Sequence, residues 1–406
     1  MAIRVLVLNQ YYPPDVAATG RIVATICQAL AEAGAEVLAI VGQPSYVSDA
    51  TDAPDHETLA KLTIRRVPMS GLRGRRKFAI RFFGYLRFLY GAWRKAEQSQ
   101  RPDLVVTFHN PPLLATLGSS LARRFGVPFI YVVQDIHPDI VVRTGWRGLP
   151  RVAILLWRRL NLMALQRATL VITLTNAMKS HLEDSYGIPG HRIIAIPLWG
   201  QPEFDDLPTD PETKQRTRLA LGIQPSDLLV LYSGNMGAMH PVEVLVHAAA
   251  RLTSAPIRFV LAGDGIKRPS IEKLARQLGV ESMQLLPYQT PADFERLVQA
   301  ADICTVALAS GLEDLCLPSR SVTFMSAGRP ILAVMPDRAP ISRDLAAAGA
   351  GWNATTAEQV AQILLELGSA PDRVLTAGMA ARNLYLERYR RTNLVARYAA
   401  AILGVV

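Results

Sequence analysis

The residues Pro-Ser-Arg-Ser at positions 318–321 combine a helix start with a basic side chain, a pattern that suits phosphate binding. We expect a helix from about Ser319 to Ala327, which Gly328 would end. The first N–H groups of a helix lack intrahelical partners and carry about +0.5 of a charge, so they favour anions. Arg320 adds a forked donor. The alternative interpretation is an N-cap serine beside a solvated arginine, with no ligand.

A second candidate phosphate site is the segment Gly263-Asp264-Gly265, which ends an expected strand and is followed by Lys267. Glycine lets a ligand approach the backbone, here at Gly265, and a lysine supplies a point charge for a leaving diphosphate. The alternative is an ordinary strand-to-helix turn with exposed cations.

A third loop, Gly234-Asn235-Met236-Gly237, ends the strand that begins the second half of the chain, and His240 comes just before the next helix. We expect Asn235, Gly237 and His240 to face a ligand. For a single histidine, a capping or surface role is the alternative.

Three residues of the first half follow expected strands in the same way. Gly20 would begin a helix and offer its N–H to a phosphate or sugar, and His109 closes a strand in TFHNPP. Asp135 follows a buried strand in VVQDIHPD, where a carboxylate can hold sugar hydroxyls or take part in acid–base chemistry. A turn histidine and an N-cap aspartate are the respective alternatives.

We expect neither a metal nor another cofactor. Asp135, His137 and Asp139 lie within five residues, which is poor spacing for a metal site without a second cluster. No Asp-x-Asp triplet occurs in the chain. The cysteines (Cys27, Cys304 and Cys316) are sparse and unpaired in spacing, as in a reducing cytoplasm, and are expected to fill the core.

The segment from Arg73 to Lys95 predicts contact with an anionic membrane surface. It holds eight basic residues within an acid-free stretch from Glu57 to Glu97. Basic residues and glycines recur every three or four positions as one polar stripe (Lys77, Arg81, Gly84, Arg87, Gly91 and Arg94), and aromatic and aliphatic residues cover the rest. Such a helix suits an anionic lipid interface. The alternatives are a core helix with snorkelling cations and, less favoured because no recognition module is visible, nucleic-acid binding.

Charge is unevenly distributed along the 406 residues. Residues 1–199 hold 24 Lys and Arg against 13 Asp and Glu, a balance of +11, whereas residues 200–406 hold 20 against 21, a balance of −1. The first half is therefore the one expected to meet a negatively charged surface. The N-terminus carries no signal-peptide pattern, and no apolar run is long enough to span a bilayer.

Strand and helix patterns alternate along the chain, and the strands are almost continuously apolar, which predicts parallel, doubly wound sheets. The alternation stops at IPLWGQPEFDDLPTDPETK, a linker-like segment, and then restarts. We expect an α/β protein of two Rossmann-like domains with a cleft between them. The expected domains are 1–199 and 200–385, followed by a helical tail in 386–406.

These loops, in this order, resemble the retaining nucleotide-sugar glycosyltransferases of family 4, which have the GT-B fold, and in particular the bacterial branch that makes surface polysaccharides. The signatures are Gly-Asn-x-Gly at 234–237, Gly-Asp-Gly-x-Lys at 263–267, and Pro-Ser-Arg before Met-x-Ala-Gly-x-Pro at 318–330. The resemblance implies that Lys267 and the helix start at Ser319 and Arg320 stabilise a departing diphosphate. It also implies that Asp135 touches the transferred sugar, that Tyr288 lies beside the nucleobase, and that Gly20 lines the phosphates. By the same resemblance, the domain 1–199 binds the acceptor, the domain 200–385 binds the nucleotide sugar, and the helix in 386–406 packs back on the first domain.

The chain departs from this family at four positions. Asn235 and His240 stand where the wider family has an Arg and a Lys, and the family's Glu-x7-Glu pair falls on Leu315 and Thr323. Because threonine cannot grip a ribose diol as a carboxylate does, the base of the donor is left open. Glu313 and Asp314 are the nearest acidic substitutes for the first glutamate.

The resemblance implies a cytoplasmic enzyme, peripheral on the inner face of the cell membrane. It would move a sugar from a nucleotide diphosphate donor to a lipid-linked or glycan acceptor, without metal. Two alternatives stay open: a nucleotide-sugar 2-epimerase of the same fold, and a catalytically inactive binding protein, which the missing carboxylates would explain.

Overall fold

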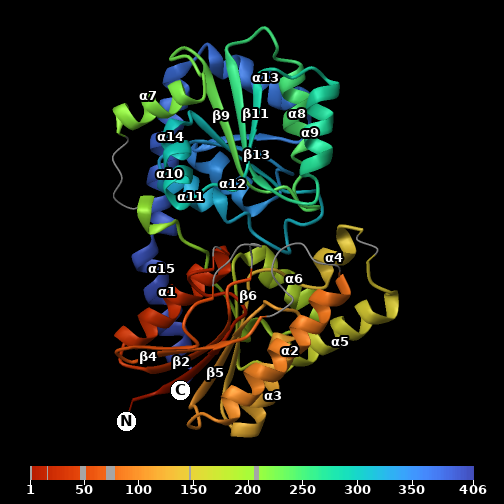
Figure 1. The fold of residues 1–406 in the computed structure, drawn as a ribbon, viewed down its shortest axis with the longest axis vertical. Helices are drawn as coiled ribbons and strands as arrows, with labels where there is room; N and C mark the ends of the chain where they lie inside the picture. Colours follow the sequence, from red (N-terminus) through yellow and green to blue (C-terminus); the bar gives the residue numbers. More distant parts are fainter. Residues whose placement is uncertain (1, 16, 46–51, 70–77, 146–147, 205–209) are drawn as a thin grey trace. The chain divides into compact units, whose positions relative to one another are not determined.

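The computed structural model describes residues 2–15, 17–45, 52–69, 78–145, 148–204 and 210–406. The chain divides into two compact units (Figure 1). Unit 1 consists of Met1–Pro197 and Thr392–Val406, and unit 2 of Leu198–Arg391. The second unit is therefore inserted between two parts of the first.

The sheet of unit 1 has the strand order β3-β4-β2-β1-β5-β6-β7-β8, and its described strands are parallel except for β3 at the edge. The central strands are apolar and fully buried, as expected of a parallel sheet covered on both faces. The strands are β1 (Arg4–Leu8), β2 (Glu36–Gly42), β3 (His56–Leu59), β4 (Leu62–Val67), β5 (Leu104–Phe108), β6 (Phe129–Val133), β7 (Leu170–Thr173) and β8 (Ile193–Ala195).

Three helices of unit 1 form one layer on its sheet: α2 packs on β2 and β4, α3 on β5 and β6, α5 on β6, and α3 contacts both α2 and α5. Glycines permit this close packing, since a Cβ at Gly118 of α3 would overlap the Cγ2 of Thr107. The helices of the unit are α1 (Ala18–Glu32), α2 (Phe78–Glu97), α3 (Leu114–Phe125), α4 (Asp139–Arg143), α5 (Arg151–Arg167), α6 (Asn176–Tyr186) and α15 (Arg391–Leu403).

The sheet of unit 2 is parallel, with the order β11-β10-β9-β12-β13-β14. The chain builds outward from β9 on one side and from β12 on the other, so the topological switch point lies between these two strands. The strands are β9 (Leu228–Asn235), β10 (Ile257–Asp264), β11 (Met283–Leu286), β12 (Ile303–Ala307), β13 (Ile331–Val334) and β14 (Gly351–Ala354).

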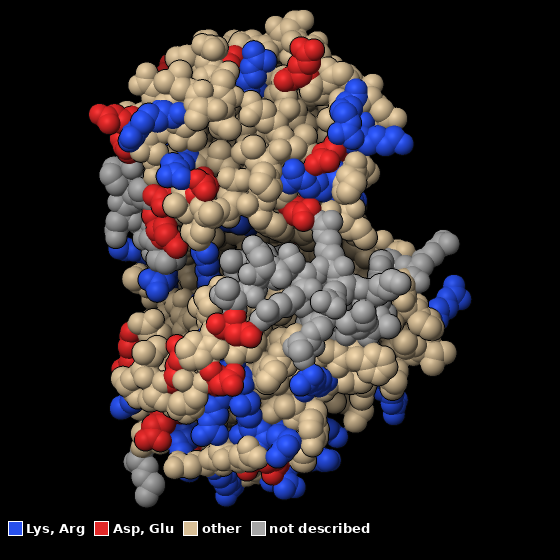
Figure 2. Space-filling model, viewed as in Figure 1, with Lys and Arg blue, Asp and Glu red and all other residues tan. Residues whose placement is uncertain are grey.

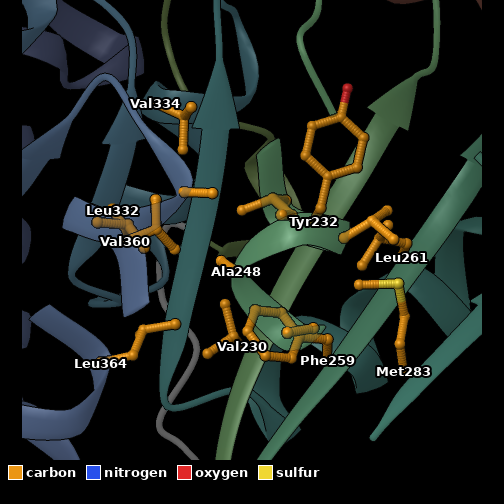
Figure 3. Packing of buried hydrophobic residues seen from close by; sticks show 14 of the residues in the cluster. Val230, Tyr232, Ala248, Phe259, Leu261, Met283, Leu332, Val334, Val360 and Leu364 are labelled. Atoms are coloured by element: carbon orange, nitrogen blue, oxygen red, sulfur yellow. The ribbon is translucent and has the colours of Figure 1, made fainter. Parts of the chain in front are cut away.

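The helices of unit 2 are α7 (Pro211–Ala220), α8 (Glu243–Ala250), α9 (Arg268–Gln277), α10 (Pro291–Ala300), α11 (Arg320–Ser326), α12 (Pro340–Ala348), α13 (Ala357–Gly368) and α14 (Pro371–Leu384). Side chains of the central strands and of α8 and α13 form one buried apolar cluster (Figure 3). Val230, Phe259 and Leu332 contribute from three strands, and Ala248 and Val360 from the two helices. This core fixes the strand ends from which the candidate site is built.

The prediction of two doubly wound parallel sheets is confirmed, and so is the burial of the three cysteines. One helix start differs from expectation, because α1 begins at Ala18 rather than at Gly20. Helix α11 runs from Arg320 to Ser326, one residue inside the expected bounds at each end. The expected cleft between the units stays a prediction.

Candidate functional site

The two glycine loops of unit 2 lie side by side, because they follow neighbouring parallel strands. Asn235 and Asp264 are register partners at the ends of β9 and β10. The Met236 N–H donates to the carbonyl of Asp264 at 2.8 Å, and the Lys267 N–H donates to the carbonyl of Met236 at 2.9 Å. The backbone thus holds the start of α9 against the loop that leads to α8.

Two glycines of these loops lie directly against the backbone of the neighbouring loop. Gly263 has a φ of +145°, and a Cβ there would overlap the carbonyl of Gly234. A Cβ at Gly265 would overlap the backbone of Met236. The expectation that Gly265 opens the backbone to a ligand is therefore corrected: on its Cβ side, the neighbouring loop fills the space.

Lys267 lies within a small polar cluster at the switch point. Its Nζ is 2.7 Å from Oε1 of Glu243 and 3.2 Å from the carbonyl oxygen of His240. The Nδ1 of His240 is 2.8 Å from the carbonyl oxygen of Ala307, at the end of β12, so Nδ1 must carry a proton. The predicted residues Lys267 and His240 thus come together at the carboxyl ends of three strands, where parallel sheets bind ligands.

Glu243 is the member of this cluster that the sequence interpretation missed. It lies in the first turn of α8, where the helix macrodipole favours a carboxylate. Its second oxygen, Oε2, is buried and has no hydrogen-bond partner among the described residues. The only signal in the sequence was a glutamate three residues after His240, which by itself is ordinary for a helix start.

Asn235 and Gly237 border this cluster. Asn235 is exposed, its carbonyl accepts a hydrogen bond from the hydroxyl of Tyr232 at 2.8 Å, and its side chain covers the Cα of Gly237. The neighbouring cation Arg268 is used within the protein, since its guanidinium donates to Glu272 and to the carbonyls of Gly263 and Leu286.

The side chains at the start of α11 contact other parts of the protein more than we expected of a ligand site. The guanidinium of Arg320 stacks on the ring of Phe294, with Cζ 4.0 Å from the ring centroid, a cation–π contact. Ser319 is half-buried and its side chain makes no capping bond, whereas Thr323 is buried inside the helix. The anion site at this seven-residue helix stays a prediction.

The acidic candidates differ in their surroundings. Glu313 is buried, and its Oε1 accepts hydrogen bonds from the Gly311 N–H at 3.0 Å and from Arg338 at 3.1 Å. Asp314 is half-buried, and Leu315, at the family's first glutamate position, is fully buried. Tyr288 follows β11 and is exposed, and its place beside a nucleobase stays a prediction.

In unit 1, His109 and Asp135 follow the neighbouring strands β5 and β6 and form a pair. Nε2 of His109 is 3.1 Å from Oδ2 of Asp135, with the histidine side chain 2% exposed and the aspartate side chain 36% exposed. The same nitrogen is 2.8 Å from the side-chain amide of Asn110. A buried histidine thus lies against a partly exposed carboxylate at the ends of these two strands.

A second histidine, His137, is stacked between His109 and Trp157, with ring centroids 6.4 and 5.6 Å away. Burial lowers the pKa of His137 to about 4, so its ring is neutral at pH 7, although the charge of Asp135 opposes this shift. The nearby Asp139 is separate from this group, since it accepts hydrogen bonds from His181 at 2.8 Å and from Tyr186 at 3.0 Å. In the described part of the chain, no group of three or more metal-binding side chains occurs.

Gly20 lies in the first turn of α1, close to the backbone of Tyr12. Its N–H donates to the carbonyl of Ala17 at 3.0 Å, and a Cβ would lie 3.0 Å from the backbone nitrogen of Tyr12. The expectation that Gly20 begins the helix and offers its N–H to a ligand is therefore corrected: the N–H is used in the first turn of α1.

The expected polar stripe of α2 is split. Gly84 is buried and Gly91 packs on Val67, whereas Arg87 and Arg94 are exposed. Four large apolar residues share the exposed side: Phe83, Leu86, Tyr90 and Trp93. The preceding basic residues Arg73, Arg75, Arg76 and Lys77 lie outside the described residues, as does the side chain of Arg81. Within the described ranges, none of the helices combines the length and apolar character that crossing a bilayer requires.

Comparisons with known proteins concern the family and the fold of the chain. The family model "Glycosyl transferase 4-like domain" matches residues 18–199, and the model "Glycosyl transferases group 1" matches residues 213–334. The chain is 24% identical to "Probable glycosyltransferase WbjE" of Pseudomonas aeruginosa over 78% of each chain. It is also 24% identical to WcaI of Escherichia coli (strain K12), named for colanic acid biosynthesis, over 80% of this chain and 81% of WcaI. The solved structure of HepE from Anabaena with UDP-glucose superposes with a TM-score of 0.72 at 15% identity, over all of both chains.

Proposed function

Because the chain belongs to the family 4 glycosyltransferases of GT-B fold, we propose that it transfers a sugar from a nucleoside diphosphate donor to a lipid-linked or glycan acceptor. The transfer retains the anomeric configuration and serves cell-surface polysaccharide synthesis. The names of WcaI and HepE support this proposal, since one refers to colanic acid and the other protein binds UDP-glucose.

The observation that carries the proposal is the position of Lys267. Its ammonium group lies at the carboxyl ends of β9 and β10, beside His240 and the switch point of a parallel sheet. A fixed cation at this place stabilises charge on a diphosphate. Arg268 cannot replace it, because that guanidinium is held by Glu272 and two carbonyls.

In the proposed reaction, the bond between the sugar's anomeric carbon and the diphosphate oxygen breaks, and the acceptor hydroxyl oxygen bonds to the same carbon. The hydroxyl proton passes to the departing phosphate oxygen. Lys267 stabilises the negative charge that develops there, and Asp135, oriented by His109, binds sugar hydroxyls. No metal or other cofactor takes part in this scheme.

The test compares Lys267→Ala with Lys267→Arg in a transfer assay that follows release of the nucleoside diphosphate. We expect the alanine variant to lose about 10²–10³ of kcat, as is typical when one fixed electrostatic donor is removed, and the arginine variant to lose less. Arg276→Ala, which removes a cation from the far end of α9, is the control. Unchanged turnover of Lys267→Ala would refute the proposal.

The two alternatives give different results in the same assay. A 2-epimerase converts the nucleotide sugar without an acceptor, whereas a glycosyltransferase forms the new glycoside only when an acceptor is present. A catalytically inactive binding protein forms neither the epimer nor the glycoside. The second alternative has one supporting observation, namely that Leu315 is buried where the family carries a glutamate.

We also propose that the protein works on the cytoplasmic membrane surface and that α2 contacts lipid. The basis is the exposed side of α2, which presents Arg87 and Arg94 together with aromatic residues. Replacing both arginines with glutamate should lower co-sedimentation with anionic vesicles. Equal sedimentation of the wild type and this variant would count against the proposal.

A further inference from the structure

Helix α5 exposes an unusual amount of apolar surface. Val152, Leu155 and Leu156 are 75%, 65% and 57% exposed. These positions recur at three- and four-residue steps, so they share one side of the helix, and Arg159 continues that side. A helix that only covered a sheet would turn its large apolar residues inward.

The rest of α5 shows that this exposure does not come from a loosely attached helix. Asn161, Ala164 and Leu165 are buried on its inward side. The side chain of Asn161 donates to the carbonyl of His137 at 2.8 Å and lies 3.2 Å from the hydroxyl of Tyr131, which donates to it. Helix α5 is therefore firmly seated, with Leu155 and Leu156 turned outward.

The charge of α5 favours an anionic partner. The helix contains no acidic residue, and Arg151 and Arg159 are exposed beside the apolar residues. Arg158 is instead used within the protein, since its guanidinium lies over the ring of Tyr186 and 3.8 Å from Asp139. Arginines at the edge of an apolar strip keep their charge among lipid headgroups while the strip enters the acyl region. A surface that binds another protein by charge complementarity would more often carry both acidic and basic residues.

Helix α5 also belongs to the same layer as α2, since α3 packs against both. Figure 1 shows the three helices grouped on one side of the sheet of unit 1. In the view of Figure 2, the surface at their position is mostly tan outside the grey residues, with Lys and Arg atoms beside it. The exposed residues of α2 include Tyr90 and Trp93, which suit a membrane interface.

We infer that α5 is a second lipid-contacting helix, and that α2 and α5 form a two-helix platform lying in the interface of an anionic bilayer. This inference deepens the membrane part of the proposed function and rests on it. The exposed apolar side chains of α5 enter the boundary of the acyl region, and Arg151 and Arg159 contact lipid phosphates.

The experiment measures binding of the full chain to vesicles of phosphatidylglycerol and phosphatidylethanolamine. Leu155→Ser/Leu156→Ser should weaken binding by about tenfold per leucine, because each side chain loses its transfer into the acyl boundary. The control is Leu375→Ser/Met379→Ser on α14 of unit 2, with 66% and 63% exposed side chains at the spacing of one helical turn, which should bind as the wild type does.

A second pair of variants tests the charge. Arg151→Gln/Arg159→Gln should weaken binding to the anionic vesicles by roughly fivefold per arginine and leave binding to phosphatidylcholine vesicles unchanged. Circular dichroism melting checks folding, and transfer to a water-soluble acceptor should be unchanged in every α5 variant. Loss of that transfer would point to misfolding and would not support the inference.

The outcomes separate α5 from the larger proposal. If Phe83→Ser/Tyr90→Ser on α2 weakens binding and the α5 leucine variant does not, α5 is not a lipid contact, while the membrane proposal stands. If the α5 leucine variant binds vesicles normally but converts a dimer to a monomer in size-exclusion chromatography, the strip is an interface between copies and the inference is overturned.

Discussion

At the residue scale, the ion pair between Lys267 and Glu243 bears directly on the proposed binding of a diphosphate by Lys267. The carboxylate offsets the charge of the one lysine in the cluster, and the ammonium is held in place at 2.7 Å. A donor that reaches Lys267 must therefore share it with Glu243. Both side chains are partly exposed, so solvent reduces the strength of the pair.

This competition predicts the effect of Glu243→Gln. The variant keeps a hydrogen-bond acceptor for Lys267 but removes the negative charge, so a nucleoside diphosphate should bind about threefold to tenfold more tightly. Isothermal titration calorimetry measures the change. Glu358→Gln, which removes a carboxylate from the first turn of another helix of unit 2, α13, is the control and should have no effect. Weaker binding of the Glu243→Gln variant would show instead that the carboxylate orients the lysine for the ligand.

The neutral, partly buried ring of His137 predicts a pH dependence of stability. Burial lowers its pKa to about 4, below the 6.5 of an exposed histidine. Below pH 6.5 the unfolded chain binds a proton that the folded chain does not, so the free energy of unfolding should fall from about pH 6.5 to about pH 4, by up to about 3 kcal/mol, and stay level above that range.

Urea denaturation of the wild type and of His137→Asn across this pH range measures the contribution, which is the difference between the two curves. His191→Asn, at an exposed position, is the control. A difference that does not change between pH 7.5 and pH 5 would contradict the prediction.

At the element scale, Gly91 of α2 and Gly118 of α3 allow these helices to pack closely on the sheet of unit 1. Gly118 is helical, so alanine would ordinarily favour the helix by about 1 kcal/mol. Its Cβ would overlap the Cγ2 of Thr107 on β5, however, and would lie 3.0 Å from the ring of Phe129. Overpacking should therefore outweigh the gain in helix propensity.

We predict that Gly118→Ala destabilises the protein by about 1–3 kcal/mol. Adding Thr107→Ser removes the methyl group in the way and should restore part of the loss, because the overlap with Thr107 is the closer of the two. Thermal unfolding of both single variants and the double variant completes the cycle. Additive effects in the double variant would mean that the helix shifts instead of meeting Thr107.

The elements also show which parts of the site the sequence could predict. The glycine loops could be placed together because the ends of parallel strands meet at one edge, and register brings Asn235 opposite Asp264. Periodicity alone could not predict which side of α2 faces the sheet. Gly91 was grouped with the polar residues of the helix, yet it packs against Val67, where a Cβ would not fit. Glu243 and the His137 stack depend on contacts between separate elements, which no local pattern contains.

At the scale of the whole molecule, the chain leaves unit 1 and returns to it. Residues 392–406 complete the unit that begins at the N-terminus. Leu394, Tyr398 and Ile402 of α15 are buried, and the hydroxyl of Tyr398 donates to the carbonyl of Ile196 at 2.9 Å. The last helix is thus part of the core of unit 1, although unit 2 precedes it in sequence.

This topology predicts a selective effect of truncation. Removing residues 392–406 takes away three large buried side chains and one buried hydrogen bond, which should cost unit 1 roughly 5 kcal/mol or more. Unit 2 lies entirely before the cut, so binding of a nucleoside diphosphate through Lys267 should persist. Hydrogen exchange resolved by peptide should show faster exchange in the strands of unit 1 and unchanged exchange in β9 and β10.

The variant Tyr398→Phe, which removes only the hydrogen bond, should have a smaller effect on the stability of unit 1, about 1 kcal/mol. If exchange rose equally in both units, α15 would stabilise the two units together rather than unit 1 alone.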